Sequence, residues 1–184
     1  MSSSWNMSGN LVRLTEYQVE DAATFLEWGR NLQLKRLSGP GAFVPTTLAQ
    51  IKTYLTSPHD DEVHFAIRLL ESQELIGHLG LKDISLNNQS AELFVRIGSP
   101  EHWGRGYGTE AIEILLRYSF LEMNLHRIQL GVTSYNTRAI ELYRRLGFRH
   151  EGTLRDFGYR DRQRYNFELY SLLFSEWEQR QISS

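Results

Sequence analysis

The sequence predicts an α/β fold of the α+β type, with a mixed, mostly antiparallel sheet and flanking helices. Three strand-like segments follow one another across 63–97. Two segments with apolar residues at helical spacing then alternate with further strand-like segments. Strands joined by tight polar turns pair antiparallel, whereas a strand, a helix and a further strand form a crossover with parallel strands. The 184 residues are 41% apolar and 23% charged, as is typical of one globular domain.

The individual elements follow from patterns of apolar, capping and turn residues. Ahead of the three strands we expect a flexible serine-rich tail at 1–9, a strand at 11–17, a helix at 20–34 and a loop at 38–41. A short helix around Leu48, Ile51 and Leu55 follows, which Thr46 or Thr47 caps and which ends near Pro58. From there we expect strands at 63–70, 75–83 and 90–97, a helix at 109–123, a strand at 126–132, a helix at 136–146, a short strand from Phe148 and a last strand at 165–173. Asn136 caps the last of these helices and Gly147 ends it. Residues 10–184 are therefore expected to form one domain.

Composition and charge exclude several classes of protein. The formal net charge is −2 and the pI is about 6.3, so no overall field attracts the chain to nucleic acid or to an anionic membrane. There are no cysteines, which removes disulfides, thiol nucleophiles and cysteine-bound zinc, and no His, Asp or Glu cluster has the spacing of metal ligands. No stretch has the length and apolar character of a membrane span, and the first residues do not read as a leader peptide. We expect a cytoplasmic protein without a metal, membrane or nucleic-acid partner.

The segment 103–111, Trp-Gly-Arg-Gly-Tyr-Gly-Thr-Glu-Ala, follows a predicted strand and opens a predicted helix. Gly104, Gly106 and Gly108 let the backbone turn tightly and leave its N–H groups uncovered, and a helix N-terminus adds about half a positive charge. These features predict an anion cradle suited to a diphosphate, with Arg105 as a local cation. The spacing fits neither the Rossmann fingerprint nor a P-loop. The alternative is an ordinary glycine-rich turn with a solvated Arg105.

A second segment, 135–148, reads Tyr-Asn-Thr-Arg-Ala-Ile and, after two residues, Tyr-Arg-Arg-Leu-Gly-Phe. Together the two segments resemble the GNAT superfamily of acetyl-CoA-dependent N-acetyltransferases. The resemblance extends over about 11–173 and is closest to the branch of the ribosomal-protein alanine and spermidine acetyltransferases. It implies the GNAT sheet with a central βαβ crossover, and acetyl-CoA as the co-substrate.

In that family the main-chain amides of a Gln/Arg-x-x-Gly-x-Gly/Ala loop bind the coenzyme A diphosphate. Gly106 and Gly108 match its last two defined positions, whereas Trp103 stands where the family has Gln or Arg. The main-chain cradle needs no particular side chain there. The cofactor-binding residues that the resemblance implies are Ile97, Trp103, Gly104, Arg105, Gly106, Tyr107, Gly108, Thr109, Asn136 and Tyr143.

Asn136 and Tyr143 are nearly two helical turns apart, so they share one face and lie about 10 Å apart along the axis. The resemblance implies that Tyr143 protonates the departing thiolate of the coenzyme and that Asn136 contacts the pantetheine arm. A phenol with a reference pKa of about 10 keeps its proton at neutral pH and can donate it. The alternatives are that Tyr143 is a core aromatic residue and that Asn136 is a helix cap. Asn136 can cap the helix and also contact the pantetheine arm.

An amine acceptor arrives protonated, so a base must accept its proton before attack. The resemblance points to Glu92, acting directly or through water, and the alternative is an edge-strand or surface glutamate. His102, His126 and His150 have suitable intrinsic pKa values but are more typical of surface histidines. Relatives carry a bulge in this strand, so a main-chain N–H near Phe94 or Val95 is the expected oxyanion donor.

The acceptor pocket of relatives is built from segments that correspond here to 25–45 and 155–165. The second segment interleaves arginines with aromatic residues, and a solvated hairpin is favoured over a polyanion-binding loop. The acidic run 60–62 is interpreted as a polar turn. Three hypotheses remain: an amine N-acetyltransferase for a peptide N-terminus or small amine, a polyamine acetyltransferase, and a coenzyme-binding module without turnover. A homodimer is left open.

Overall fold

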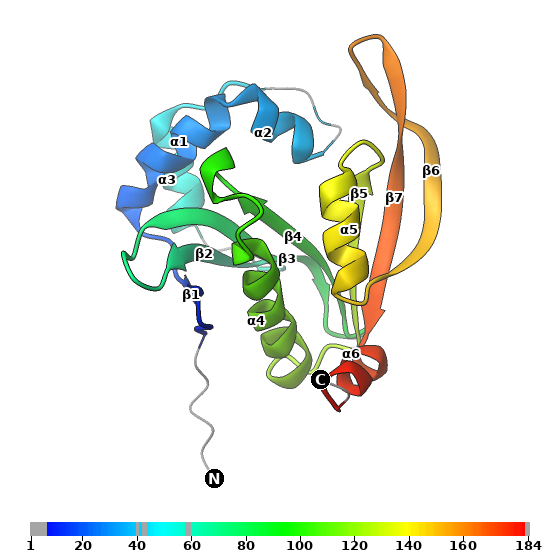
Figure 1. Cartoon of the computed structure of the whole chain (residues 1–184). Coiled ribbons are helices and arrows are strands. Elements are labelled where there is room, and N and C mark those ends of the chain that lie inside the picture. The colour runs from blue at the N-terminus through cyan, green and yellow to red at the C-terminus, as the bar shows by residue number, and fades with distance from the viewer. Residues whose placement is uncertain (1–6, 40, 42–43, 58–59, 183–184) are drawn as a thin grey trace.

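One mixed sheet organises the part of the chain that the computed structural model describes, which is residues 7–39, 41, 44–57 and 60–182 (Figure 1). Its strand order is β1-β2-β3-β4-β5-β7-β6. The strands are Val12–Thr15 (β1), Val63–Leu69 (β2), Leu75–Ser85 (β3), Ser90–Ile97 (β4), Arg127–Thr133 (β5), Arg149–Arg160 (β6) and Gln163–Leu173 (β7). Neighbouring strands of this sheet are antiparallel except β4 and β5, which confirms the mixed sheet and the crossover.

The helices differ from the expected ones mainly near the N-terminus. They are Ala22–Arg30 (α1), Leu32–Leu37 (α2), Leu48–Thr56 (α3), Tyr107–Leu121 (α4), Thr137–Arg145 (α5) and Phe174–Ile182 (α6), with 3-10 turns at Val19–Asp21 (η1) and Pro100–His102 (η2). The one helix expected at 20–34 is divided at Asn31, whose backbone is extended and whose side chain accepts from the N–H groups of Gln33 and Leu34. A side chain that caps a new helix competes with continuation of the old one. The sequence patterns did not predict α6, and α4 begins two residues earlier than expected.

The expected tail at 1–9 is partly ordered. Ser8 forms a β-bridge with Arg13, and Leu14 N donates to Met7 O (2.7 Å). The chain therefore folds back along β1 from Met7 onward, while residues 1–6 lie outside the described part. Pro40 and Pro58, expected in a loop and at a helix end, also lie outside it.

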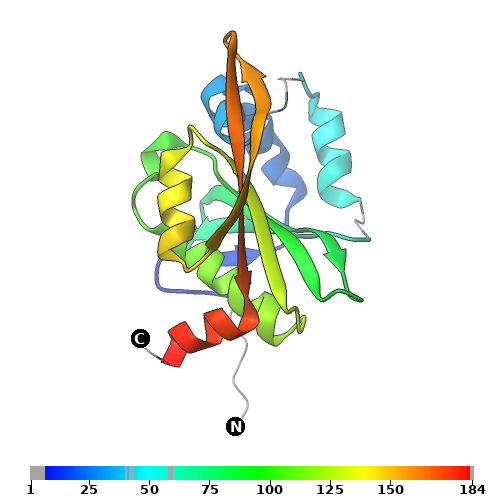
Figure 2. The ribbon, with the colours of Figure 1, turned by 90° about the vertical axis from the view of Figure 1, so that its right-hand side faces the viewer.

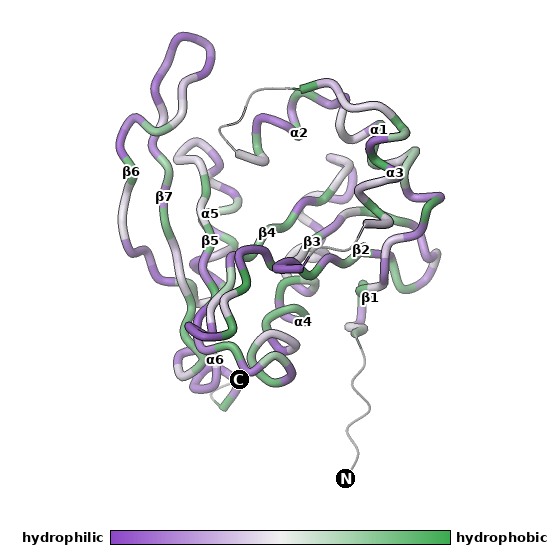
Figure 3. Tube along the Cα trace, turned by 180° about the vertical axis from the view of Figure 1, so that it is seen from behind, coloured by the Kyte–Doolittle hydropathy of each residue, from purple (hydrophilic) through white to green (hydrophobic). Residues whose placement is uncertain are grey.

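The last two strands form a longer hairpin than expected. β6 is not a short strand but runs from Arg149 to Arg160, and β7 starts at Gln163. Asp161 and Arg162 alone connect them, with φ of 50° and 61°, the left-handed geometry of a two-residue hairpin turn. The hairpin rises past the sheet beside α2, and its tip is hydrophilic (Figures 1 and 3).

The two faces of the sheet carry different helices. Successive strand residues point to opposite faces. On β2 the ring of His64 contacts Tyr54 of α3, whereas Phe65 contacts Tyr118 of α4, with ring centroids 5.6 and 5.7 Å apart. α4 therefore covers one face, and α3 with its neighbour α1 covers the other, an arrangement visible in Figure 2. The core beneath α4 includes the buried residues Leu79, Leu81, Leu93, Ile112, Leu115 and Leu116.

β4 and β5 pair over a short segment and then diverge. Their register runs from Ser90 with Arg127 to Glu92 with Gln129. Beyond these residues the carboxyl-terminal parts of the two parallel strands separate. A crevice at the carboxyl ends of parallel strands is where open α/β sheets bind ligands. The divergence therefore positions the candidate site.

Candidate active site

A cleft of about 1040 Å³ opens where β4 and β5 diverge. Its lining includes the successive β4 residues 92–97, which point alternately to both faces, so the cleft passes through the sheet. The structure brings together these residues that the sequence predicts for the site: Glu92, Ile97, Trp103, Gly108, Asn136 and Tyr143. The other predicted residues, Gly104, Arg105, Gly106, Tyr107 and Thr109, form the turn that enters α4 beside this lining.

The glycine turn exposes main-chain N–H groups at the start of α4. Gly104 and Gly106 have φ of 74° and 87°, values that favour glycine, and Gly106 is the N-cap. The first helical bond runs from Glu110 N to Gly106 O (3.0 Å), so the N–H groups of 107–109 precede the intrahelical ladder. A Cβ added at Gly104 meets nothing within 4 Å. The space and the donors therefore fit a bound diphosphate.

Side-chain contacts hold this turn in place. The indole of Trp103 donates from Nε1 to Ile97 O (3.1 Å), which ties the turn to the end of β4. The guanidinium of Arg138 lies 4.4 Å from the centroid of the Trp103 ring. The carboxylate of Glu110 accepts from the N–H groups of three residues that lead into β1, namely Asn10, Leu11 and Val12. Trp103 thus has an anchoring contact in place of the family's Gln or Arg.

Tyr143 and Asn136 lie on the α5 side of the cleft. Tyr143 is 8% exposed and packs against Phe148, and burial raises the pKa of its phenol to about 12. Asn136 Oδ1 accepts from Ala139 N (3.3 Å), which is the expected helix cap, and Nδ2 donates to Leu37 O (3.2 Å) at the end of α2. The amide of Asn136 thus joins α5 to α2 while lining the cleft.

Glu92 lies on β4 with its carboxylate 2.8 Å from the ammonium of Lys82. The bulge expected near Phe94 or Val95 is not there: the β3–β4 register is continuous from Ile97 to Glu92, and the irregularity lies in β3 between Lys82 and Ser85. An N–H can still face the cleft without a bulge, because alternate residues of a strand direct their N–H groups to opposite sides.

The direction of the Val95 N–H follows from the neighbouring ladder. Gly98 N donates to Ile76 O (2.8 Å), so Gly98 and every second residue before it direct their N–H groups toward β3. Val95 therefore directs its N–H the other way, toward β5, beyond the last β4–β5 pair at Glu92. An N–H in this position is available to an oxyanion in the cleft.

The histidines named as alternative bases do not line the cleft. His102 pairs with Glu74 and His150 with Glu168, and His126 precedes β5 at the opposite end of the sheet. Sequence reasoning missed the two histidines that do line it, His64 and His78.

His64 and His78 belong to a polar cluster under α1 and α3. His64 Nε2 pairs with Glu62, and its Nδ1 hydrogen-bonds with the hydroxyl of Tyr54 (3.2 Å). The hydroxyl of Tyr17 hydrogen-bonds with His78 Nδ1 (3.2 Å). Burial, and then the charges of nearby Arg96 and His64, hold the pKa of His78 well below its usual value. Glu62 is thus part of the cleft wall and not only a polar turn residue.

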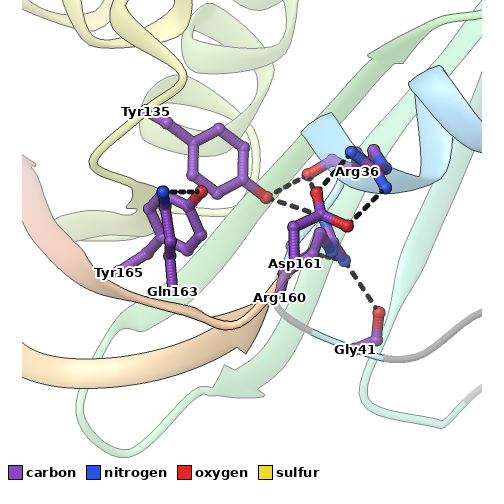
Figure 4. Close-up of polar contacts among 8 residues, drawn as sticks. Arg36, Gly41, Tyr135, Arg160, Asp161, Gln163 and Tyr165 are labelled. Carbon is purple, nitrogen blue, oxygen red and sulfur yellow. Dashed lines mark hydrogen bonds and ion pairs between the residues drawn. The ribbon is translucent and has the colours of Figure 1, made fainter.

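The tip of the β6–β7 hairpin is tied to α2 rather than simply solvated (Figure 4). Asp161 pairs with Arg36 at 2.7 Å. The guanidinium of Arg160 donates to Tyr135 Oη (2.7 Å) and to the carbonyls of Arg36 and Gly41 (2.9 and 3.1 Å). These contacts join both segments that the sequence assigned to the acceptor pocket.

Neither a metal centre nor a membrane-spanning helix is found among the described residues. They contain no group of three His, Cys, Asp or Glu side chains that could hold a metal ion. In the same part of the chain no helix combines the length and apolar character needed to cross a membrane.

Several known proteins are similar to this chain in sequence or in architecture. An uncharacterized N-acetyltransferase of Bacillus licheniformis is 29% identical over 169 residues, which are 89% of this chain and 93% of that protein. The spermidine N(1)-acetyltransferase of Vibrio cholerae is 42% identical over 82 residues, 45% of this chain and 47% of that enzyme. The crystal structure of spermidine N-acetyltransferase from Vibrio cholerae in complex with CoA and spermine superposes with a TM-score of 0.83 at 24% identity, covering 92% of this chain and 99% of that one.

The family assignment rests on most of the chain. The profile of the acetyltransferase (GNAT) domain matches residues 12–149, from the start of β1 to the start of β6. This range contains the glycine turn, the divergent strands and α5. The chain therefore belongs to the GNAT acetyltransferase family, whose members take the acetyl group from acetyl-CoA and transfer it to an amine.

Proposed function

We propose that this protein acetylates a small primary amine or a peptide N-terminus that enters the cleft from the face of α1 and α3. The observation that carries this proposal is the passage through the sheet. Exposed N–H groups at the start of α4 lie at one end, Tyr143 lines the passage, and a polar pocket lies on the opposite face. Two substrates can therefore meet at the gap between β4 and β5 from different sides.

The residues would act as follows when acetyl-CoA supplies the thioester. The amides of 107–109 and the positive end of α4 bind the diphosphate, and Trp103 and Asn136 line the path of the pantetheine arm. Val95 N–H donates to the acetyl oxygen, where negative charge develops as the amine attacks. Holding both substrates in one cleft supplies much of the rate by orientation alone.

The acceptor nitrogen loses two protons during the transfer. Glu92 accepts a proton from the acceptor ammonium, directly or through water, so that the nitrogen can form its bond to the acetyl carbon. As the carbon–sulfur bond breaks, the phenol of Tyr143 donates its proton to the thiolate, and the second proton that the nitrogen loses on forming the amide returns to the Tyr143 phenolate through water. The raised pKa of Tyr143, about 12, supports this role because the phenol stays protonated at neutral pH.

The second candidate is polyamine acetylation, which the similarity to the Vibrio cholerae spermidine acetyltransferase favours. That similarity covers less than half of either chain. The cleft itself argues against a polycationic acceptor, because Lys35 and Arg96 line it on the side of α2. A homodimer and a cytoplasmic location remain proposals from the sequence.

A thiol-release assay tests the function. The protein is incubated with acetyl-CoA and a panel of small amines, peptides and polyamines, and free coenzyme A is followed with time. We expect release that depends on a small amine or a peptide. Acetyl-CoA binding without thiol release from any amine would instead favour a coenzyme-binding module, and release with polyamines alone would favour the second candidate.

A further inference from the structure

Arg96 places a half-buried positive charge in the acceptor side of the cleft. Its side chain leaves β4 on the face of α1 and α2, and Nε donates to Ser38 Oγ (2.8 Å) at the end of α2. Burial lowers the pKa of its guanidinium. A guanidinium has five N–H donors in a planar fork, and one contact to a hydroxyl leaves most of them for other acceptors.

No carboxylate of the described residues pairs with this guanidinium. The two carboxylates that line the cleft have other partners: Glu92 pairs with Lys82, and Glu62 pairs with His64. Burying a charge away from water is costly unless an opposite charge or several hydrogen bonds compensate. The half-buried guanidinium of Arg96 therefore has no opposite charge paired with it among the described residues.

A second cation lies close to the first. Lys35 of α2 also lines the cleft, and no ion pair joins its ammonium to a described carboxylate. Partial burial lowers the pKa of Lys35, and the positive charge of Arg96 lowers it further. Two cations that repel each other across a cleft would both be stabilised by an anion between them.

This charge is separate from the cradle for the diphosphate. A Cβ added at Gly108 would lie 3.6 Å from Ile97 Cγ1, so Ile97 points toward α4 and the glycine turn. Because neighbouring strand residues point to opposite faces, Arg96 points away from that cradle. The anion that it would bind therefore belongs to the acceptor.

We propose that the acceptor is a primary amine that also carries a carboxylate, and that Arg96, with Lys35, binds this carboxylate. The inference rests on the proposed acetyl transfer and names the class of its acceptor. Arginine forms bidentate pairs with carboxylates, which fixes orientation as well as adding affinity. The same cations disfavour a polyamine.

The position of Arg96 relative to the proposed oxyanion donor limits the length of the acceptor. Val95 N–H, the proposed oxyanion donor, lies in the strand backbone one residue before Arg96. The guanidinium of Arg96 lies at the far end of a long side chain that extends from β4 to Ser38 at the end of α2. The amine and the carboxylate of the acceptor are therefore separated by several bonds, as in a short ω-amino acid.

The test uses matched acceptors. The purified full chain is assayed for thiol release with ω-amino acids from 3-aminopropanoate to 6-aminohexanoate, with the primary amide of each, and with 1,4-diaminobutane. We expect the kcat/KM of the best ω-amino acid to exceed that of the corresponding primary amide by about tenfold or more, because the amide loses one charge-assisted contact. An amide or diamine used equally well would overturn the inference while leaving acetyl transfer intact.

Variants connect this preference to the two residues. Arg96→Gln should raise the KM of the carboxylate acceptor about tenfold or more, leave kcat/KM for the matched amide within about twofold, and leave the KM of acetyl-CoA unchanged. Lys35→Gln should show a smaller change of the same kind. Lys52→Gln, on the exposed side of α3 outside the cleft, is the matched control. Equal losses with carboxylate and amide would show a merely structural role and contradict the proposal.

Calorimetric titration keeps the two proposals distinguishable. The same ω-amino acids and amides are titrated into the protein saturated with coenzyme A, with and without Arg96→Gln. Binding of carboxylates that depends on Arg96, without any turnover, would support the anion site and contradict acetyl transfer to these amines. Absence of both binding and turnover for every carboxylate would overturn the acceptor class.

Discussion

The two ends of the cleft are built in different ways. The end that we propose for the coenzyme consists of main-chain N–H groups within one short stretch, 103–109, at the start of α4. The end that we propose for the acceptor consists of side chains from α1, α2, α3, β2, β3 and β4, and contacts from the β6–β7 hairpin close it. A backbone cradle binds one invariant group, whereas a pocket of side chains can change its specificity one residue at a time.

Filling the cradle should have the largest effect. Gly108→Trp places an indole beside Ile97, in the lining between the glycine turn and β4, on the path that we propose for the coenzyme. We expect loss of measurable acetyl-CoA binding in a calorimetric titration. Gly152→Trp on β6 is the control, because a Cβ there meets nothing within 4 Å and the residue does not line the cleft. Normal binding by Gly108→Trp would show that the coenzyme does not use this turn.

Removing the phenol at the junction of the two ends should affect turnover and not binding. Tyr143→Phe is expected to lower kcat by about 100-fold, a usual effect of losing one general acid, with little change in acetyl-CoA affinity. Because the pKa of Tyr143 is about 12, ionisation of this phenol should not limit the wild-type rate up to about pH 10. Tyr118→Phe, on α4 outside the cleft, is the matched control. An unchanged kcat would remove the assignment of Tyr143 as the acid.

A smaller effect is expected from the proposed base at the acceptor end. Glu92→Gln should lower the rate at neutral pH by about tenfold or more, because only the small neutral fraction of the amine can then attack. The loss should shrink toward pH 10, where the acceptor deprotonates without help. The measurement is the pH dependence of kcat/KM, with Glu113→Gln on the exposed side of α4 as the control. A profile that matches the wild type would point to a different base.

The same contrast explains what could be predicted from the sequence. The glycine turn at the start of α4 could be predicted because its glycines, the helix start and the preceding strand are contiguous in the sequence. The crossover could be predicted from the order strand, helix, strand. The sequence did not predict that three residues of β2, β3 and β4, namely His64, His78 and Arg96, lie together at the cleft. The register of these strands brings the three residues to one face, and a single sequence does not show which face meets the cleft.

Local patterns also failed where tertiary contacts decide the structure. The length of β6 depends on its pairing with β7, which extends to the Arg160–Gln163 pair, and on the contacts of the hairpin tip with α2. The composition of 149–160 indicates neither of these contacts. Asn31 divides the first helix because its side chain caps the next one. The placement of Trp103 against Ile97 likewise needed the fold.

The smallest predicted effect concerns the scaffold below both ends of the cleft. Hydrogen bonds from Arg127 and Ser171 lower the pKa of Glu151 from 4.5 to about 2 and join β5, β6 and β7. Since folding favours the ionised form, this stabilisation is complete above pH 4.5 and is lost as the pH falls toward 2. The carboxylate is 41% exposed, so Glu151→Gln should cost less than about 1 kcal/mol of unfolding free energy at pH 7. Urea unfolding at pH 7 and at pH 3 should show the difference from wild type shrinking at the lower pH, with KM values for both substrates unchanged. A difference that stays constant with pH would mean that the charge of Glu151 does not contribute to the stability of these strands. A changed acceptor KM would show that the scaffold and the acceptor end are coupled.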